Sequence, residues 1–313
     1  MKKRMFPAFV LAMLLALGVA CGNDDDAASP SATESTAEAP GFPVTITDDL
    51  GASVTLETQP QAIVALAPSF VEVLFGIGAG DSLVAVDENT DYPAEAESLP
   101  EVSGFEPSVE AIASYEPDLV LLTYDPGGLQ TALGDLGIAS LFFSNPTDFE
   151  GLYTQIETLG EVVGQSEEAA DLVGQMEADV EEIVGQLEGV TKGPRVFHEL
   201  DSTLFTVGPG SFQHEAYEML KAQNIAEPTR EAFPQMSNEA VIAADPEVIL
   251  LADGEFGESL ETVAARPAWD AITAVKNGRV VPVDDDLLSR PGPRVVDGME
   301  ELASILYPEI FGQ

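Results

Sequence analysis

Two glutamates, Glu110 and Glu239, occupy the same position in two similar stretches of the chain. The stretches read SVEAIASYEPDLVLLT at residues 108–123 and SNEAVIAADPEVILLA at residues 237–252. Each pattern predicts a short helix, a break at a proline and a buried strand, with the glutamate in the first helical turn. Ser108 and Ser237 are the expected N-caps, and an acid in the first turn interacts favourably with the helix dipole, which is its common role. Two such carboxylates in two halves of one chain can also make equivalent contacts with a twofold-symmetric partner.

The chain contains few side chains that could catalyse a reaction or bind a metal directly. Its two histidines, His198 and His214, are predicted on separate elements, whereas a zinc or manganese site needs several such ligands. The glycines of GIGAG at residues 76–80 follow a predicted helix instead of joining a strand to one, so we expect them to cap its end. The sequence has no Gly-x-Ser-x-Gly elbow, catalytic cysteine or Walker lysine. We therefore predict no enzyme activity, no catalytic residue, no metal site and no cofactor.

The charge of the chain excludes a nucleic-acid partner. Aspartate and glutamate number 55 against 12 lysines and arginines, which gives a formal net charge of −43. Binding to nucleic acid needs a basic surface, and residues 5–191 contain no lysine or arginine. Because 45% of the residues are hydrophobic, the chain can still bury a sizeable core.

The N-terminus has the pattern of a targeting segment. Residues 1–21 comprise a basic start, an apolar run and small residues before Cys21, the only cysteine of the chain. This segment resembles a bacterial lipoprotein signal, in which the cysteine is acylated after cleavage, although Gly18 stands where leucine is usual. We expect lipidation at Cys21, and simple secretory cleavage after Ala20 is the alternative. Residues 22–42 are small, polar and acidic, which predicts a flexible linker.

Strands and helices are predicted to alternate through most of the remaining chain. We expect a hairpin at its start, an N-terminal lobe over residues 43–146 and a C-terminal lobe over residues 191–313. Apolar strands that alternate with helices indicate a parallel sheet covered on both faces. A helix at residues 69–78 is expected to begin with a capping box of Ser69 and Glu72. The fold class is therefore α/β, with two Rossmann-like lobes that each contain one copy of the repeated stretch.

Residues 147–190 interrupt this alternation. Apolar residues recur there at spacings of three and four, which predicts helix and no strand. Ser166 through Glu188 would form one helix of roughly 34 Å at 1.5 Å per residue. We expect this single long backbone helix to join the two lobes.

Three longer segments carry a resemblance to a known family. They are PQAIVALAPSFVEVLFGIGAGDSLVAVDENTDYP, LPEVSGFEPSVEAIASYEPDLVLL and RPAWDAITAVKNGRVVPVDDDLLSRPGPRVVDGMEELASIL. Taken in order with the long helix, they are similar to the substrate-binding component of an ABC importer of the iron–siderophore and cobalamin type. The resemblance covers residues 43–313.

The resemblance implies a set of partners and a location. In that family, one glutamate of each lobe docks onto arginines of the dimeric permease, and Glu110 and Glu239 both match its motif. We therefore expect a monomer that delivers a small molecule to an ABC permease dimer with its ATPase subunits. A lipid anchor would hold it on the outer face of the cell membrane, or it would lie in the periplasm. A sensor or adhesion protein with the same fold, and without transport, is the alternative of another class.

The resemblance also places the ligand site, in loops that follow the strands. Aromatic side chains in such loops offer a large flat ligand broad apolar contact at little entropic cost. Any one of them, above all Phe212 or Phe233, could instead fill the core of its lobe. The predicted ligand-binding residues are Pro68, Ser69, Tyr92, Phe105 and Tyr124 in the first lobe and Phe212, Phe233, Asp286 and Arg290 in the second.

Cobalamin or a related corrinoid is the ligand that the sequence favours. A corrinoid is bulky with mostly amide groups at its periphery, which suits an aromatic site. Ferric catecholate or carboxylate siderophores are anionic and usually need several bases, as a cluster of arginines or lysines. The first lobe has none, so they could come only from Arg230, Arg266, Arg290 and Arg294. The segments TDYPAEA and SGFEP also resemble the cobalamin branch more closely, and a ferric siderophore or heme is the alternative.

Overall fold

The computed structural model describes residues 41–312, all of which lie in one of the two units into which the chain divides. The predicted signal segment, Cys21 and nearly all of the predicted linker lie outside the described residues. Phe42, which we expected in the linker, is buried in the core, and its ring lies beside Gly164. The packed part of the chain therefore includes Phe42 and does not begin at residue 43.

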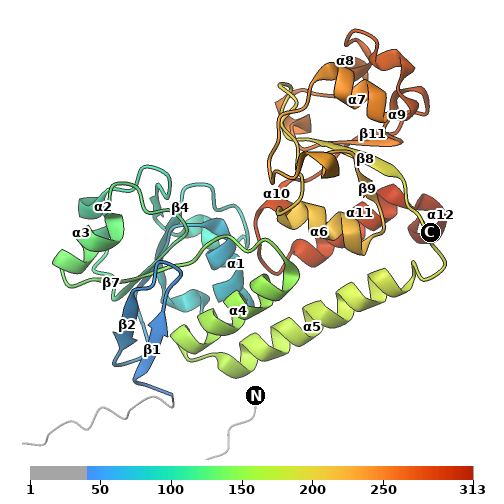
Figure 1. The fold of residues 1–313 in the computed structure, drawn as a ribbon. Coiled ribbons are helices and arrows are strands. Elements are labelled where there is room, and N and C mark those ends of the chain that lie inside the picture. The colour runs from blue at the N-terminus through green and yellow to red at the C-terminus, as the bar shows by residue number, and fades with distance from the viewer. Residues whose placement is uncertain (1–40, 313) are drawn as a thin grey trace, which may run out of the picture. The chain divides into compact units, whose positions relative to one another are not determined.

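The N-terminal lobe contains a hairpin and a parallel sheet (Figure 1). Strands β1 (Val44–Thr47) and β2 (Ser53–Leu56) pair antiparallel, as predicted. The sheet has the order β5-β4-β3-β6-β7, and all its neighbouring strands are parallel. Its strands are β3 (Ile63–Ala65), β4 (Leu83–Asp87), β5 (Glu101–Val102), β6 (Leu119–Leu122) and β7 (Ala139–Phe142).

The C-terminal lobe contains a second parallel sheet with the order β11-β10-β8-β9. Its strands are β8 (Arg195–Glu199), β9 (Gln223–Asn224), β10 (Val248–Leu251) and β11 (Val280–Pro282). Two separate parallel sheets confirm the predicted α/β class with two lobes. The repeated stretches supply β6 in one sheet and β10 in the other.

Helices cover both faces of the N-terminal sheet. The residues of β6 alternate between these faces, as the pleat of a strand requires. Leu119 and Leu121 join the core formed with α1 and α4, whereas Val120 and Leu122 join a separate core under α2 and α3. The helices are α1 (Pro68–Gly76), α2 (Val109–Ala113), α3 (Leu129–Asp135) and α4 (Phe149–Val163).

The C-terminal sheet is covered in the same way. In β10, Val248 and Leu250 join the core that includes α6 and α11, whereas Ile249 and Leu251 join the core under α7, α8 and α9. The helices that follow the first lobe are α5 (Ser166–Gly185), α6 (Phe212–Met219), α7 (Asn238–Ala244), α8 (Leu260–Ala264), α9 (Thr273–Lys276), α10 (Asp286–Ser289), α11 (Val295–Leu306) and α12 (Pro308–Phe311).

The segment between the lobes is two helices, α4 and α5, which lie side by side (Figure 1). The break falls at Gly164, whose φ of 70° is left-handed, and Gln165 N–H donates to Gly160 O at 2.7 Å. This geometry ends a helix. Helix α5 has 20 residues, roughly 30 Å at 1.5 Å per residue, and buries the predicted stripe that includes Val173 and Met176. The long helix predicted from Ser166 to Glu188 is therefore confirmed as α5, which ends three residues earlier, whereas the preceding part of the segment 147–190 forms a separate helix, α4.

The two repeated stretches have equivalent backbone geometry. Ser108 and Ser237 cap α2 and α7, and each side chain accepts a backbone N–H from three residues further on at 3.2 Å. Each stretch has one left-handed residue directly before its proline, Glu116 with φ 51° and Asp245 with φ 48°. The predicted N-caps are therefore confirmed in both lobes.

An acid after each proline ties the stretch to the first strand of its sheet. The Asp118 carboxylate accepts the N–H of Ala62 at 3.1 Å, and the Glu247 carboxylate accepts the N–H of Arg195 at 3.0 Å. The similarity between the stretches thus extends from sequence to hydrogen bonding. As a result, Glu110 on α2 and Glu239 on α7 lie at equivalent places. Each helix covers the face of its sheet opposite the one packed on α4 in the first lobe or on α6 and α11 in the second.

The predicted capping box at the start of α1 is wrong. Pro68 is the first helical residue, Ala67 is the N-cap, and no side chain caps the helix. Pro68 has no backbone N–H that needs an acceptor, so a cap has less to satisfy there. Glu72 is buried and accepts hydrogen bonds from Arg294 instead.

Alanine substitutions at two helical glycines should have opposite effects on stability. At Gly160, an added Cβ would lie too close to the Cβ of Ala169 and 2.9 Å from Gln165 O. Gly160→Ala should therefore lower the free energy of unfolding by about 1–3 kcal/mol. At Gly174 in α5 a Cβ meets open space, so Gly174→Ala should raise that free energy by about 0.5–1 kcal/mol. Urea denaturation of both variants checks this, and a stabilising Gly160→Ala would show that the corner between α4 and α5 is not close-packed.

Candidate functional site

The strand orders define one switch point in each sheet. In the N-terminal lobe the chain runs outward from β3 to β4 and β5, and then places β6 on the other side of β3. In the C-terminal lobe it runs from β8 to β9 and then places β10 on the other side of β8. Open α/β sheets bind ligands outside the carboxyl ends of their strands at such points. The loops after β3, β6, β8 and β10 are therefore the candidate lining of a ligand site.

Exposed aromatic rings follow the strands of the N-terminal sheet. Tyr92 follows β4, Phe105 follows β5 and Tyr124 follows β6, and the exposed fractions of their side chains are 46%, 73% and 49%. The rings of Phe105 and Tyr124 stack with centroids 5.8 Å apart and planes at 13°. The structure thus brings two of the predicted ligand residues together as an uncovered apolar surface next to the switch point.

The C-terminal sheet presents two exposed rings that the sequence interpretation missed. Phe205 follows β8 and is 40% exposed, and Phe256, after β10, is 89% exposed. Phe233 is also exposed, and its loop reaches Phe205 through the bridge between Phe205 and Gln235. A signal for Phe256 exists in the sequence, because GEFG places a lone aromatic between glycines just after the repeated strand.

Three of the predicted ligand residues are less accessible. Pro68 begins α1 and is partly buried, and Ser69 is buried. Phe212 is only 4% exposed and packs against Phe149, with ring centroids 4.6 Å apart. Its ring fills the core where α6 meets α4, which is the alternative role that we expected for an aromatic residue there.

Arg290 and Asp286 form an ion pair that extends to the other lobe. Arg290 Nη2 lies 2.8 Å from Asp286 Oδ2, and Arg290 Nη1 lies 2.5 Å from Asp91 Oδ1. Asp91 belongs to the loop after β4. This guanidinium therefore already has two carboxylate partners before any ligand arrives.

The other arginines that could meet an anionic ligand are mostly occupied as well. Arg266 binds both oxygens of the buried Glu199 and also Glu258 at 2.7 Å, and Arg294 binds Glu72. Arg230 is exposed, and its guanidinium has no hydrogen bond or ion pair within residues 41–312. An anion would have to displace carboxylates from all of these arginines except Arg230.

Buried acids lie at the carboxyl edge of the C-terminal sheet. Asp253 follows β10 and is 5% exposed, and its Oδ1 has no hydrogen-bond partner among the described residues. Burial, together with repulsion from the nearby Glu199, raises the pKa of Asp253 from its usual 3.8 to about 6. Burial also raises the pKa of Glu199, although Arg266 opposes that shift. This edge therefore disfavours further negative charge.

A second buried cluster lies on the opposite face of β8. His198 is 1% exposed and its Nδ1 lies 2.6 Å from Tyr217 Oη, while its Nε2 lies 3.8 Å from Asp285 Oδ1. Burial lowers the pKa of His198, and the nearby Asp285 opposes the shift. The described residues contain no group of three or more His, Cys, Asp or Glu side chains arranged to hold a metal ion.

Glu110 and Glu239 are both exposed in the first turns of α2 and α7. The Glu110 carboxylate accepts a hydrogen bond from Ser108 Oγ at 3.2 Å, consistent with a part in capping. Figure 1 shows α2 and α7 on the faces of their sheets that lie away from α5. Both acids are thus free to meet a partner, and neither lies in a core.

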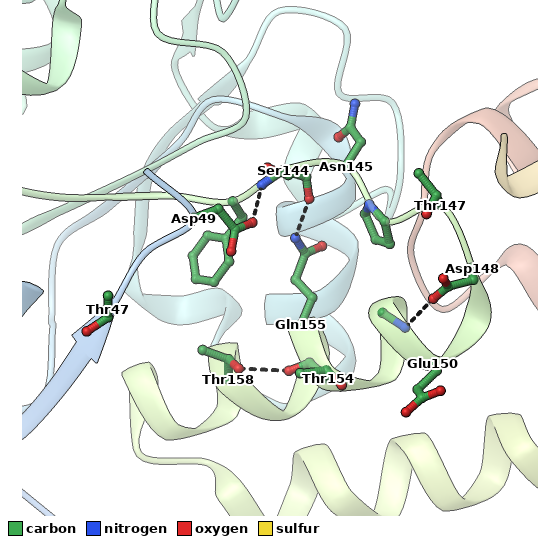
Figure 2. Close-up of a pocket in the computed structure, with 13 residues that line it drawn as sticks. Thr47, Asp49, Ser144, Asn145, Thr147, Asp148, Glu150, Thr154, Gln155 and Thr158 are labelled. Atoms are coloured by element: carbon green, nitrogen blue, oxygen red, sulfur yellow. Dashed lines mark hydrogen bonds between the residues drawn. The ribbon is translucent and has the colours of Figure 1, made fainter. Parts of the chain in front are cut away.

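Figure 2 shows a polar hollow in the N-terminal lobe that is separate from these loops. It has a volume of about 760 Å³ and lies between the turn of the hairpin and α4. Its polar groups bind one another: Asp49 accepts the N–H of Ser144 at 2.6 Å, and the Gln155 amide donates to Ser144 O at 3.2 Å. The predicted ligand residues do not line it.

The arrangement of two parallel sheets, each with a switch point, matches that of known binding proteins. Residues 63–287 match the family described as periplasmic binding protein. A Bacillus subtilis protein, the uncharacterized ABC transporter substrate-binding lipoprotein YvrC, is 34% identical, with 99% of each chain covered. A cobalamin-binding protein of Halobacterium salinarum is 29% identical, with 96% of this chain and 84% of that one covered.

Solved structures show the same fold. The periplasmic vitamin B12 binding protein BtuF of Vibrio cholerae superimposes with a TM-score of 0.68 at 26% identity, covering 80% of this chain and 97% of that one. The periplasmic heme-binding protein RhuT of Roseiflexus sp. RS-1 gives a TM-score of 0.72 at 23% identity, covering 79% and 98%, which shows the fold alone.

The chain belongs to the periplasmic binding protein family. It has the two-lobed α/β fold of the substrate-binding components of ABC importers, which are transport proteins and not enzymes. Proteins of this class carry small ligands to permease and ATPase partners. Among the residues that the structure describes, none of the helices has the length and apolar content needed to cross a membrane.

Replacing Asp253 by asparagine should change the pH dependence of stability. The folded state holds this proton more tightly than the unfolded chain, so the contribution of Asp253 is favourable at low pH and is lost as pH rises from about 4 to about 6. Asp253→Asn should therefore stabilise the protein at pH 7 by about 1–2 kcal/mol and change little at pH 4. Urea denaturation at both pH values and fixed ionic strength measures this. Asp270→Asn, at an exposed acid of the same lobe, is the control, and equal effects of the two variants would contradict the prediction.

Proposed function

We propose that this protein captures cobalamin or a related corrinoid between its lobes and delivers it to an ABC permease. The observation that carries the proposal is the combination, in the loops after the strands, of exposed aromatic rings with arginines that are already paired with carboxylates. Phe105, Tyr124 and Phe256 offer wide apolar faces, while Arg266 and Arg290 are neutralised by carboxylates. A bulky ligand with a neutral, amide-rich periphery suits such a surface.

The rival ligands fit less well. Ferric catecholate and carboxylate siderophores are anionic. Of the four arginines that could meet such a charge, Arg230, Arg266, Arg290 and Arg294, only Arg230 is free of an ion pair within the described residues. The propionates of heme would meet the same lack of free arginines. The relatives named for cobalamin or vitamin B12 add support, because one of them covers nearly the whole chain.

Glu110 and Glu239 are the proposed contacts with the permease. They occupy equivalent places on α2 and α7, on the faces that are not packed against α4 and α5. Ion pairs at the rim of an interface mainly orient partners and speed their association. A pair of acids on two similar lobes can therefore align the binding protein with a dimeric permease.

Lipidation at Cys21 would keep the protein at the outer face of the membrane, beside its permease. The acidic residues that follow the cysteine would form the tether. The similarity to a protein named as a substrate-binding lipoprotein supports this location.

The ligand assignment is tested by thermal shift with cyanocobalamin, heme and a ferric catecholate siderophore. Cyanocobalamin at a hundredfold excess over its Kd should add about 2.7 kcal/mol of stability and raise Tm, while the other two should not. Phe105→Ala should weaken corrinoid binding roughly tenfold, since it removes the outer ring of the stacked pair. Leu136→Ala is the matched control, because Leu136 is similarly exposed at the end of α3. Binding of heme or the ferric catecholate in preference to the corrinoid would overturn the assignment.

Docking is tested by reversing charge at both glutamates. Glu110→Lys with Glu239→Lys should reduce uptake of labelled corrinoid by roughly tenfold or more, because the lysines would face the basic side chains of the permease. Affinity for the free ligand should stay within twofold or so of the unmodified protein, because both glutamates are exposed and neither is among the proposed ligand-binding residues. Glu177→Lys with Glu181→Lys on α5 makes the same change of charge and should leave uptake intact. A loss of ligand affinity equal to the loss of uptake would argue against docking.

A further inference from the structure

A shielded ion pair joins the two lobes beside Tyr92. Arg294, the N-cap residue of α11, donates from Nε to Glu72 Oε2 at 3.0 Å and from Nη2 to Glu72 Oε1 at 2.6 Å. The Glu72 side chain is 1% exposed and that of Arg294 is 17% exposed. Two parallel hydrogen bonds to one carboxylate fix the plane of a guanidinium, which a lysine in its place would not reproduce.

The same guanidinium lies over the ring of Tyr92. Its Cζ is 4.3 Å from the ring centroid, within the range of a favourable cation–π contact. The neighbouring Asp91 is held by Arg290, four residues before Arg294. Two arginines of the C-terminal lobe thus hold two consecutive residues in a loop of the N-terminal lobe.

Packing alone does not fix the Tyr92 ring. The side chain is nearly half exposed, and it borders a hollow of about 390 Å³ that Glu72, Phe75, Pro93 and Arg294 also line. An aromatic ring beside such a space can turn unless a specific contact holds it. Of the contacts described above, the guanidinium of Arg294 is the one that covers a face of this ring.

We propose that Arg294 is a positioning residue for the ligand site: held by Glu72, it orients the ring of Tyr92 and couples that ring to the contact between the lobes. This inference rests on the proposed function, in which Tyr92 contacts the ligand. A purely structural Arg294, which only anchors the start of α11, would leave the orientation of Tyr92 unchanged when it is replaced.

The first test needs no ligand. Hydroxyl-radical footprinting with mass spectrometry measures the oxidation rate of Tyr92 relative to Tyr124, a ring of similar exposure. In the double variant Glu72→Gln, Arg294→Met, which removes both charges and so leaves no unpaired buried ion, the ratio should rise roughly threefold. Arg195→Met, which breaks ion pairs within one lobe, should leave it unchanged. An unchanged ratio in a double variant with native circular dichroism overturns the proposal.

The second test measures coupling in ligand affinity. Cyanocobalamin is titrated into Glu72→Gln and into Glu72→Gln, Arg294→Met, each with Tyr92 and with Tyr92→Leu. Replacing Arg294 should weaken binding roughly 3- to 10-fold when Tyr92 is present and much less when it is leucine. Equal losses in both backgrounds would show a purely structural arginine. If the unmodified protein binds no corrinoid, the proposed function fails, while the footprinting ratio still decides the role of Arg294.

Discussion

A continuous apolar core lies under the inner faces of both sheets, and the other features depend on it. Leu121 of β6 and Leu250 of β10 belong to the same buried cluster, which also includes the apolar stripe of α5 and residues of α4, α6 and α11. A close-packed core resists gradual deformation. Successive residues of a strand point to opposite faces of the sheet. The residues of β6 and β10 that point away from the shared core therefore form separate outer cores under α2 and α7. The helices that bear Glu110 and Glu239 therefore pack on two sheets that share one core.

Charge acts on this framework in two different ways. Within residues 41–312, carboxylates neutralise Arg266, Arg290 and Arg294, and two of these arginines also join the lobes. The carboxylates remove positive charge from the candidate ligand site. The contacts that Arg290 and Arg294 make between the lobes hold the loop of Tyr92. The remaining acids give the surface a strong negative field that repels anions and attracts a basic partner. The same excess of acid therefore affects both the choice of ligand and the proposed docking.

The sequence predicted the parts of the fold that depend on local periodicity. Alternating apolar strands, the stripe on α5 and the repeated caps at Ser108 and Ser237 all have periods or motifs that can be read along the chain. The capping box at Ser69 failed because Glu72 meets a residue more than 200 positions away, and no local pattern reports that pairing. The separate helix α4 was not distinguished within residues 147–190, because helical periodicity continues on both sides of Gly164.

The site could be predicted only in outline, for the same reason. Loops after strands can be found from sequence, so Phe105 and Tyr124 were predicted in loops that follow strands, where the structure has them. Whether a ring in such a loop is buried depends on what packs against it, which is why Phe212 lies in the core against Phe149. Phe256 was missed because a single aromatic residue in a short glycine-rich loop has no periodicity to mark it.

The central claim, that one shared core holds the two glutamate-bearing helices at a fixed separation, can be measured directly. Spin labels at Ala111→Cys and Ala240→Cys, equivalent exposed positions in α2 and α7, report the distance between those helices in a Cys21→Ser background. Pulsed double electron–electron resonance should give one narrow distribution, and saturating cyanocobalamin should shift its mean by less than the width of the peak. A broad or two-peaked distribution, or a larger shift, would show that the lobes move independently and would contradict the account.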